Sequence, residues 1–529
     1  LLPLDGGEAV AVDTGELEPA AFAWSPDGAT LAVPAPIPPT EAEEEAKAAT
    51  GDVVVWGEPH PDRLWTVPIA GGAPTRVGDA DVHVAEIAWS PDGRTIAAIV
   101  SPTGDPLEVV LRTVATLAVD TGALTTLVPV PGGATRPEWS PDGAHLAWLG
   151  TRDTLTLHNT LNVRAADGSH PLELAHALDP TLGDFAWAGP DAVVATITHR
   201  TATELVRIGL DGRSEVVPGI PDHPVLTSLA GGGARFATIA QSPTVPPEPA
   251  WLDLAGGRGV AAHPNDVSGW ALGAVEVVSW RGPGGATIEG VLTMPPGATG
   301  AVPLMVYPHG GPDSVTTLSF DERTRYFAGK GYAVLRPNYR GGTGYGHAFY
   351  AANRGKLGAL EFGDIEAGVD ALIRRGTADA ARLVYGGWSW GGYLTAWTIG
   401  HTDRYRAAVA GAAVVDVISQ YALSDLNHGV AADWEYRGNP WTAPARFARS
   451  NPVGSLVHAT TPTLIAHGRS DVRVDFSSSV ILWRALTDIG CPVELLAFPD
   501  EPHGFRDPRH VIHLLDQWTG WYDQHLPAR

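Results

Sequence analysis

Gly387-Trp388-Ser389-Trp390-Gly391 lies between a strand-like run, residues 382–385, and a helical run, residues 394–399. Because glycine has no Cβ, the two glycines that flank this pentapeptide permit a tight turn, which leaves the serine hydroxyl exposed at the carboxyl edge of a sheet. The bare G-x-S-x-G pattern is weak evidence in a glycine-rich chain, and a purely structural turn is the alternative. The strand–turn–helix context nevertheless predicts that Ser389 is a nucleophile.

Around this turn, strand-like runs alternate with amphipathic helical segments. The expected strands are residues 304–307, 333–335, 383–385 and 463–466, and the expected helices include residues 364–374 and 477–486. Alternation of this kind is typical of a parallel sheet covered by helices on both faces. Together with the serine turn it predicts an α/β-hydrolase catalytic domain, which we assign to residues 273–529.

A serine hydroxyl is a poor nucleophile near neutral pH, so it needs a base, and the base needs a carboxylate that fixes its tautomer. In this fold the acid and then the histidine follow the serine along the chain. Asp471 follows the strand-like run 463–466, and His503 follows the run 493–498. We therefore predict a triad of Ser389, Asp471 and His503. A turn-capping role is the alternative for Asp471, and Asp475 is then the second choice of acid.

Nineteen histidines compete for the role of base, so position has to decide. His467 precedes the acid and lies at or in a strand end, where a packing role is favoured. His510 and His513 fall on the expected final helix. His503 alone combines the loop after a strand with the required order.

The oxyanion of acyl transfer needs two backbone donors aimed at one point. The N–H of Trp390, the residue after the nucleophile, is the first choice. The loop after an early strand supplies the second, and Gly311 in the stretch 307–312 is our choice there. A plain strand-ending turn is the alternative.

The first half of the chain contains an internal repeat with a Trp-Ser-Pro-Asp-Gly signature. It occurs at residues 24–28, 89–93 and 139–143, with a degraded copy at 187–191. Pro presets φ, Asp caps its own turn and Gly takes positive φ, so each copy predicts a hairpin. A second turn in each unit gives about four strands per repeat of roughly 45–65 residues, which indicates the blades of a β-propeller over residues 1–272. A β-sandwich is the alternative.

Five or six blades fit before residue 270, and the chain opens on what resembles the last hairpin of a blade, without Met. From the sequence we therefore expect the propeller to be incomplete at its N-terminus, with blades or a targeting segment preceding Leu1. The acidic stretch 41–45 is expected to be a solvated loop. A site for a substrate's amino terminus is the alternative.

Bulk properties exclude several classes of function. The length exceeds what one core usually holds, and the formal charge of -24 disfavours nucleic acid and anionic membrane surfaces as partners. Cys491 is the only cysteine, and no apolar run approaches the ~20 residues that cross a bilayer. A cytoplasmic location is expected. No metal or organic cofactor is expected, since no cluster of Cys and His suggests one.

The second half resembles the prolyl oligopeptidase family of serine peptidases, and specifically its acylaminoacyl-peptidase-like branch. The motifs that carry the resemblance are residues 309–312 (HGGP), 338–346 (NYRGGTGYG), 387–393 (GWSWGGY), 461–468 (TPTLIAHG) leading to Asp471, and 503–505 (HGF). A propeller in front of the catalytic domain agrees with the family's architecture. Fewer blades than the family's seven, and no paired-glutamate motif of the dipeptidyl-peptidase type, are the departures.

The resemblance implies further site residues. Arg473 is implied as a ligand for a substrate carbonyl or terminal carboxylate, with a surface ion pair as the alternative. Val474, Val415, Ile418 and Tyr421 are implied as walls of the pocket for the residue before the scissile bond, although core residues look identical in sequence. An apolar preference at that position would follow.

The expected function is a serine peptidase that acts on oligopeptides, with the propeller restricting access. The alternatives are a carboxypeptidase or dipeptidyl-peptidase of the same family, an esterase with the same triad, and a non-catalytic propeller scaffold. The number of subunits stays open, and a homo-oligomer is compatible with the family.

Overall fold

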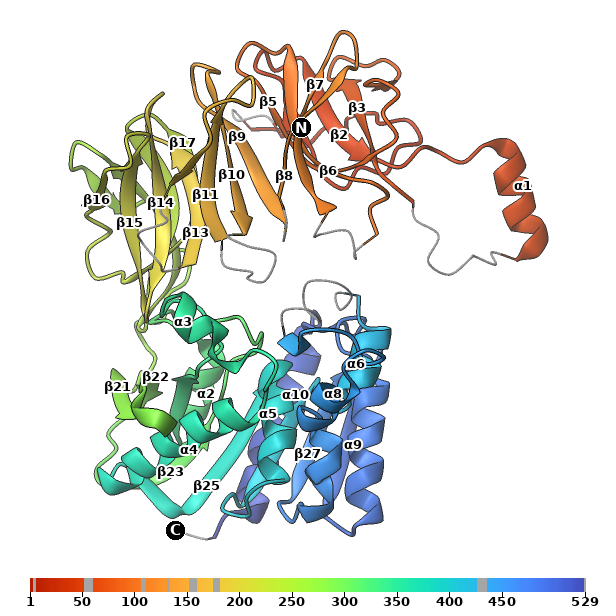
Figure 1. The fold of residues 1–529 in the computed structure, drawn as a ribbon. Coiled ribbons are helices and arrows are strands. Elements are labelled where there is room, and N and C mark those ends of the chain that lie inside the picture. Colours follow the sequence, from red (N-terminus) through yellow and green to blue (C-terminus); the bar gives the residue numbers. More distant parts are fainter. Residues whose placement is uncertain are drawn as a thin grey trace.

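The chain is described by a computed structural model. It describes residues 1–2, 6–51, 60–105, 111–130, 133–151, 159–174, 181–425 and 435–527. Two regions follow each other along the chain, a set of small antiparallel sheets and then one large mostly parallel sheet (Figure 1). The predicted fold class, a β-propeller followed by an α/β-hydrolase domain, is confirmed.

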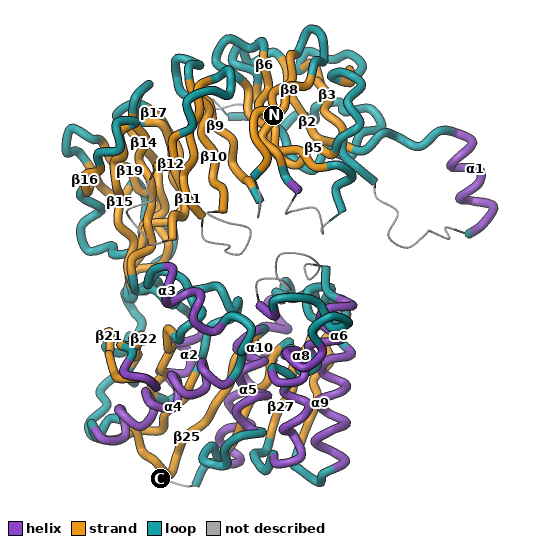
Figure 2. The backbone as a smooth tube through the Cα atoms, in the orientation of Figure 1, coloured by secondary structure: helices purple, strands orange, loops and turns teal. Residues whose placement is uncertain are grey.

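The strands up to residue 260 form five sheets of four strands among the described residues, each an antiparallel meander (Figure 2). The first two sheets contain β1 (Ala23–Trp24), β2 (Thr30–Ala35), β3 (Arg63–Pro68), β4 (Thr75–Arg76), β5 (His83–Trp89), β6 (Thr95–Ser101), β7 (Thr113–Ala118) and β8 (Leu124–Pro129). The third and fourth contain β9 (Ala134–Trp139), β10 (His145–Thr151), β11 (Asn159–Ala165), β12 (Leu172–Leu174), β13 (Thr181–Trp187), β14 (Ala192–His199), β15 (Ala202–Gly209) and β16 (Ser214–Val217). The fifth contains β17 (Val225–Gly232), β18 (Arg235–Ser242), β19 (Val245–Asp253) and β20 (Arg258–Val260).

The repeated signature forms the hairpin turns that its chemistry predicts. In the second sheet, Ser90 Oγ donates to Asp92 Oδ1 at 2.7 Å, and the same oxygen of Asp92 accepts from the N–H of Arg94 at 3.1 Å. Gly93 closes the turn with φ of 70°. The same serine–aspartate bond recurs at 2.6 Å in the copies at residues 24–28 and 139–143. These local bonds lie in the turn between the first two strands of the first, second and third sheets.

The tryptophan of the signature bonds the second, third and fourth sheets each to the sheet before it. The indole N–H of Trp89 donates to the carbonyl of Ala23, that of Trp139 to Ala88, and that of Trp187 to Glu138. In every case the acceptor is the residue immediately before the tryptophan of the preceding copy. One contact, used three times, therefore sets the register between neighbouring blades.

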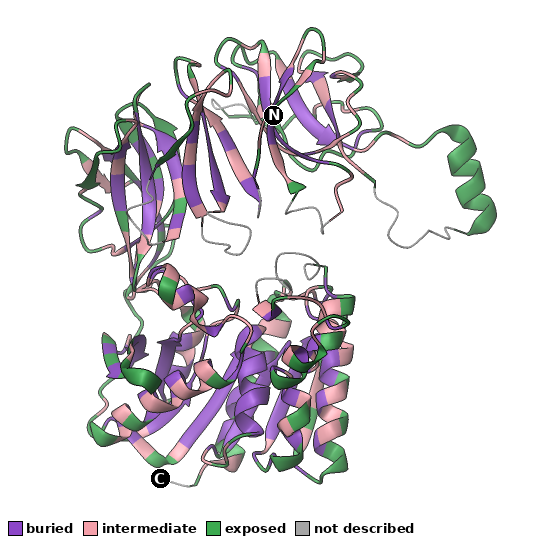
Figure 3. Cartoon of the chain, viewed as in Figure 1, coloured by how far each residue is buried: buried purple, intermediate pink, exposed green. Residues whose placement is uncertain are grey.

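The acidic stretch 41–45 does not form the expected loop. It opens helix α1 (Glu41–Thr50), which protrudes from the propeller and is exposed along its length (Figure 3). The reason is local, because Thr40 and Glu43 form a reciprocal capping box at the helix start and Gly51 ends it in the left-handed region. The prediction that the stretch is solvated holds, while the prediction of a loop is wrong.

The second region is built on one eight-stranded sheet in the order β21-β22-β24-β23-β25-β26-β27-β28. Its strands are β21 (Val275–Arg281), β22 (Thr287–Thr293), β23 (Val302–Val306), β24 (Ala333–Asn338), β25 (Ala378–Trp388), β26 (Ala407–Gly411), β27 (Thr463–Gly468) and β28 (Val493–Phe498). β21, β22 and β24 pair antiparallel, and every pairing from β24 to β28 is parallel. The four strands expected from sequence are all present.

Helices cover both faces of this sheet (Figure 1). They are α2 (Glu322–Gly329), α3 (His347–Tyr350), α4 (Ala359–Arg374), α5 (Trp390–Ile399), α6 (Val417–Leu423), α8 (Pro444–Arg449), α9 (Ser477–Asp488) and α10 (Pro508–His525), with 3₁₀ turns η3 (Pro283–Gly285), η4 (Ala351–Asn353) and η5 (Pro452–His458). Side chains of α4, α5 and α9 join the cores on one face, and those of α2 and α10 join the core on the other. No helix in the described part of the chain is long and apolar enough to cross a membrane.

The propeller contacts the second region through its fourth and fifth sheets. The Arg200 guanidinium pairs with the buried Glu289 carboxylate on β22, and the Arg200 N–H donates to Gly344 O at 2.8 Å. The N–H of Leu318 donates to Thr201 O at 2.7 Å. Ion pairing and backbone bonds therefore join the two regions on the side of α3, where Figure 1 shows them close together.

Candidate functional site

Ser389 occupies a sharp turn between β25 and α5. Its φ of 60° and ψ of -120° are a strained combination for a residue with a Cβ, and such strain is concentrated at functional positions. The glycines on either side are required, because a Cβ at Gly387 would lie 2.5 Å from Gly391 C and a Cβ at Gly391 would lie 2.5 Å from Pro308 O. The sequence therefore folds here into a turn that presents a partly exposed serine at the carboxyl edge of the sheet.

The loop that carries His503 is bound directly to this turn. The indole N–H of Trp388, the residue before the serine, donates to the His503 carbonyl at 2.8 Å. The Trp388 ring also packs edge-on against Phe505, with ring centroids 5.1 Å apart. The residue that precedes the predicted nucleophile thus positions the predicted base.

His503 and Asp471 form a direct pair. His503 Nδ1 lies 2.7 Å from Asp471 Oδ2, and since a carboxylate can only accept, this nitrogen carries the proton. Nε2 is then the free basic nitrogen, as a general base requires. The Asp471 side chain is fully buried while 27% of the His503 side chain is exposed, so the imidazole has access to a substrate.

The Asp471 carboxylate is held by four donors in total. Oδ1 accepts from the N–H groups of Arg473 and Val474 at 2.9 and 3.0 Å, and Oδ2 accepts from His503 and from His467 Nε2 at 3.0 Å. Burial raises the pKa of Asp471, but the hydrogen bonds from His467 and His503 outweigh it and hold the pKa well below its ordinary range. The group is therefore an anion at every pH at which the protein would work.

Among the described residues, Ser389 Oγ makes no hydrogen bond in this structure. The bond between a nucleophile and its base is commonly long before substrate is present. What the structure shows directly is the elbow, the His503–Asp471 pair and the Trp388 bond that holds the two loops together.

The donors predicted for an oxyanion lie beside the serine. Trp390 is the first residue of α5, so its N–H has no acceptor within the helix. A Cβ added to Gly310 would lie 3.4 Å from Ser389 Cβ, which places the loop containing Gly311 against the nucleophile. Tyr339 steadies this loop, because its hydroxyl donates to His309 O at 2.8 Å and its ring stacks on His309 at 4.2 Å. Burial lowers the pKa of His309 to about 4, so its ring is neutral.

Arg473, implied as a substrate ligand, lies in the loop just after Asp471. Its guanidinium makes two bonds to the Asp425 carboxylate, Nε to Oδ1 at 2.6 Å and the second at 3.2 Å. The Arg473 side chain is 42% exposed. The ion pair considered as the alternative is therefore present, and it leaves the guanidinium accessible at the surface.

The four residues implied as pocket walls divide into two groups. Val415 and Val474 are buried members of the cores around the sheet, with 0% and 1% exposure. Ile418 is 39% exposed on α6, and Tyr421 on the same helix packs edge-on against Phe447. Of the four, Ile418 offers the clearest surface to a ligand.

Sequence reasoning missed two residues of this site. Trp388 was considered only as part of the turn, and His467 was assigned a packing role. His467 is indeed fully buried, yet it also binds the carboxylate of Asp471. Its position four residues before the acid was the available signal. Asp475, the second choice of acid, instead caps the start of α9 by accepting from the N–H of Ser477 at 2.9 Å.

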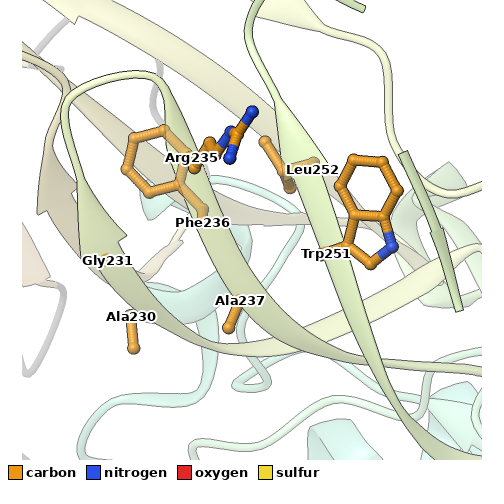
Figure 4. A pocket seen from close by; sticks show the side chains of 7 residues that line it. All are labelled: Ala230, Gly231, Arg235, Phe236, Ala237, Trp251 and Leu252. Carbon is orange, nitrogen blue, oxygen red and sulfur yellow. The ribbon is translucent and has the colours of Figure 1, made fainter. Parts of the chain in front are cut away.

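A separate groove lies on the fifth sheet of the propeller, between β17, β18 and β19 (Figure 4). Its lining residues are Ala230, Gly231, Arg235, Phe236, Ala237, Trp251 and Leu252. None of them belongs to the site predicted from sequence, and the chemistry described above does not use this groove.

The fold and the elbow define the class of the molecule, an α/β-hydrolase joined to a β-propeller. A family model described as the prolyl oligopeptidase family matches residues 318–529. This part of the chain is therefore similar to the prolyl oligopeptidase family of serine peptidases.

Curated relatives match mainly this domain. The uncharacterized peptidase YuxL of Bacillus subtilis is 32% identical over 257 residues, which is 47% of this chain and 39% of that protein. The acylamino-acid-releasing enzyme of Arabidopsis thaliana is 33% identical over 235 residues, 42% of this chain and 30% of that enzyme. The chain therefore spans well under half the length of these two relatives.

Solved structures match nearly the whole chain in fold. The crystal structure of puromycin hydrolase aligns with a TM-score of 0.79 at 23% identity, covering 97% of this chain and 79% of that one. Pyrococcus horikoshii acylaminoacyl peptidase aligns with a TM-score of 0.74 at 18% identity, covering 97% and 89%. At such identities these structures support the arrangement of propeller and hydrolase, and nothing finer.

Proposed function

We propose that this protein is a serine peptidase that hydrolyses short peptides through an acyl-enzyme on Ser389. The observation that carries the proposal is the strained serine elbow tied by Trp388 to a loop whose histidine is paired with a buried aspartate. The match of residues 318–529 to the prolyl oligopeptidase family supports it.

The roles follow from the geometry. Ser389 Oγ attacks the scissile carbonyl while His503 Nε2 takes its proton, and Asp471 stabilises the imidazolium that forms. The N–H groups of Trp390 and Gly311 hold the oxyanion. His503 then returns the proton to the leaving amine, and water hydrolyses the acyl-enzyme by the same route.

The proposed substrates are oligopeptides, with the propeller (residues 1–272) restricting access to the catalytic domain (residues 273–529). Ile418 and Tyr421, with Val415 and Val474 behind them, would favour an apolar residue before the scissile bond. Arg473 would bind a substrate carbonyl or terminal carboxylate, which its exposure permits and for which it must share its charge with Asp425. An acylaminoacyl-peptidase-like or oligopeptidase-like cut is our first choice, because acylamino-acid-releasing enzymes are among the relatives matched.

A carboxypeptidase or dipeptidyl-peptidase mode remains the second candidate, since a dipeptidyl-peptidase 5 of Schizosaccharomyces pombe aligns over 416 residues at 24% identity. We further propose a cytoplasmic location and assembly into homo-oligomers, and neither nucleic acid nor a membrane surface is a proposed partner.

Two experiments test this proposal. A fluorophosphonate probe should label the wild-type protein at Ser389, as read by peptide mass spectrometry. Failure to label, where a control hydrolase reacts, would favour a non-catalytic scaffold. Turnover of acyl-peptide anilides should exceed that of simple esters, and activity confined to esters would make the protein an esterase. Mass spectrometry of the products from one blocked and one unblocked peptide then separates the exopeptidase modes.

A further inference from the structure

His467 makes two sets of contacts that together fix its tautomer. Its Nε2 lies 3.0 Å from Asp471 Oδ2 and 2.9 Å from the carbonyl oxygen of Val474. Both neighbours can only accept at pH 7, so Nε2 carries a proton. Nδ1 lies 2.7 Å from Ser479 Oγ, and in the neutral ring it accepts from that hydroxyl. His467 is therefore a donor aimed at the triad carboxylate, with its far side anchored to α9.

No water can take over this role without a change in the structure. The side chains of His467 and Asp471 are both 0% exposed, and Ser479 is fully buried as well. When a buried carboxylate loses one hydrogen-bond donor, water cannot take the place of that donor. The full free-energy cost of the lost bond therefore remains. Two imidazoles therefore share one oxygen, Oδ2, of a fully buried carboxylate.

We propose that His467 is a positioning residue of the catalytic triad, which holds Asp471 Oδ2 in place for His503 and takes a share of its negative charge. This inference rests on the proposed function, since it concerns how the triad is tuned. It assigns to the histidine of the stretch 461–468 a role beyond packing in the core.

Two consequences follow for catalysis. The backbone donors on Oδ1 and the His467 donor on Oδ2 together prevent the carboxyl group from rotating, so His503 stays aligned with Ser389. Hydrogen bonding also spreads the charge of the carboxylate. Removing the His467 donor leaves more charge facing His503, which stabilises its imidazolium form, so protonation would inactivate the base at a higher pH.

The pH argument depends on the charged groups packed around the pair. From the loop after β27 these are Asp471 itself and Arg473, whose guanidinium is paired with Asp425. From the loop after β28 it is Glu501, which accepts from the N–H groups of Arg506 and Asp507. His510 on α10 binds the same Glu501 at 2.6 Å. Apart from Asp471, each of these charged groups already has a partner of its own, and none of these partners is His467. A substitution of His467 therefore changes the hydrogen bond to Asp471 and leaves the other pairs as they are.

A matched pair of substitutions tests the proposal. In His467→Gln the amide nitrogen can reach the position of Nε2 and still donate to Asp471. In His467→Asn it reaches only the position of Nδ1, so it keeps a partner in Ser479 and loses the carboxylate. We expect His467→Asn to lower kcat by roughly 10-fold or more with little change in KM, from the loss of a hydrogen bond to a charged group. We expect the acid limb of kcat/KM to move up by about half a pH unit. His467→Gln should keep most of the activity and the wild-type limb.

Rates are divided by the amount of Ser389 that a fluorophosphonate labels, so that unfolded protein does not lower the measured kcat. His401→Asn is the matched control. Its imidazole bonds to the Trp397 carbonyl and packs on the rings of Trp397 and Phe362, and among the described residues it makes no hydrogen bond or ring contact with the triad, so both readouts should be unchanged. The proposal is overturned if the Asn and Gln variants at position 467 have the same kcat and the same acid limb, whether both resemble wild type or both are impaired.

Should His467→Asn not fold, Ser479→Ala tests the same claim from the other side of the ring. Loss of the anchor on Nδ1 should lower kcat by about fivefold, the size of one neutral hydrogen bond, and move the acid limb in the same direction. An unaltered limb overturns the proposal. A wild-type protein that cleaves no peptide and takes no probe would instead refute the proposed function, which makes the two failures distinguishable.

Discussion

The propeller and the catalytic domain differ in how often they use a contact. In the propeller, the bond from a tryptophan indole to the carbonyl before the preceding tryptophan occurs three times. In the catalytic domain, the bonds from Trp388 to His503 and from His503 to Asp471 each occur once. Loss of one repeated contact should lower the stability of the propeller only in part, because the same contact between the other blades remains. Loss of a single contact at the site should abolish a function while leaving the fold.

The largest effect is expected at the nucleophile. Ser389→Ala should reduce kcat/KM for a peptide anilide by about 10⁵–10⁶-fold, because the acyl-enzyme has no attacking oxygen. The thermal midpoint should stay near the wild-type value, since Ser389 Oγ makes no hydrogen bond among the described residues. Steady-state kinetics and circular dichroism measure both. Ser470→Ala, an exposed serine in the loop beside the acid, is the control and should retain activity. Residual turnover within 100-fold of wild type would show that another group attacks.

The next effect concerns the acid. Asp471→Asn should lower kcat by about 10⁴-fold, because an amide in place of the carboxylate favours the wrong tautomer of His503 and cannot stabilise its imidazolium. Labelling of Ser389 by a fluorophosphonate should slow in parallel. Asp475→Asn is the matched control on the same loop, and its effect should be confined to the cap of α9. Equal losses in the two variants would contradict the assignment of Asp471.

The same contrast explains which parts could be predicted from sequence. The blade turns and the serine elbow are local, since Pro, Asp and Gly at fixed offsets dictate their backbone. The triad order followed from the fold once the elbow was accepted. The contact of Trp388 with His503 could not be read in this way, because it joins a strand end to a loop that only the folded sheet brings near. The spacing of His467, four residues before Asp471, is visible in the sequence, but the sequence does not show that the loop turns the carboxylate back onto the strand end. Buried core residues and the walls of an apolar pocket are the same residue types. The sequence therefore could not separate the buried Val415 and Val474 from the exposed Ile418. The charge of the acidic stretch 41–45 predicts a solvated loop, but the capping box of Thr40 and Glu43 starts a helix there.

A smaller effect is expected from a repeated contact. Trp139→Phe removes the bond to Ala88 O and should lower the stability of the propeller by about 1 kcal/mol, a shift of a few degrees in thermal midpoint. Activity per labelled serine should be unchanged. Trp24→Phe is the matched control, because this indole is 45% exposed and donates to no carbonyl in the part of the chain that the structure describes. Differential scanning calorimetry measures both. If the two variants are equally destabilised, packing of the ring matters and the repeated bond does not.

An effect that appears only as a change in pH dependence concerns a carboxyl of the catalytic domain that the chemistry does not use. Glu361 in the first turn of α4 is fully buried and accepts from Asn353 Nδ2 at 2.8 Å and from the N–H of Gly358 at 2.9 Å. Burial raises its pKa from 4.5 to about 7. Between these two values the folded state binds more protons than the unfolded state, so the free energy of unfolding falls as pH rises through this window. The stabilising contribution is complete below the lower value and is lost above the higher one.

Glu361→Gln should therefore remove this part of the pH dependence, because the amide is neutral at every pH and Asn353 can turn its own amide to present an oxygen. Between pH 5 and pH 8, the thermal midpoint of the variant should rise relative to that of the wild type as pH rises. Glu322→Gln, on an exposed position of α2, should follow the wild-type curve throughout. A Glu361→Gln curve that runs parallel to wild type would mean that Glu361 is ionised in the folded protein across this range. Its two donors would then hold a buried anion, as the four donors around Asp471 do, and the contrast between a structural and a catalytic carboxyl in this domain would disappear.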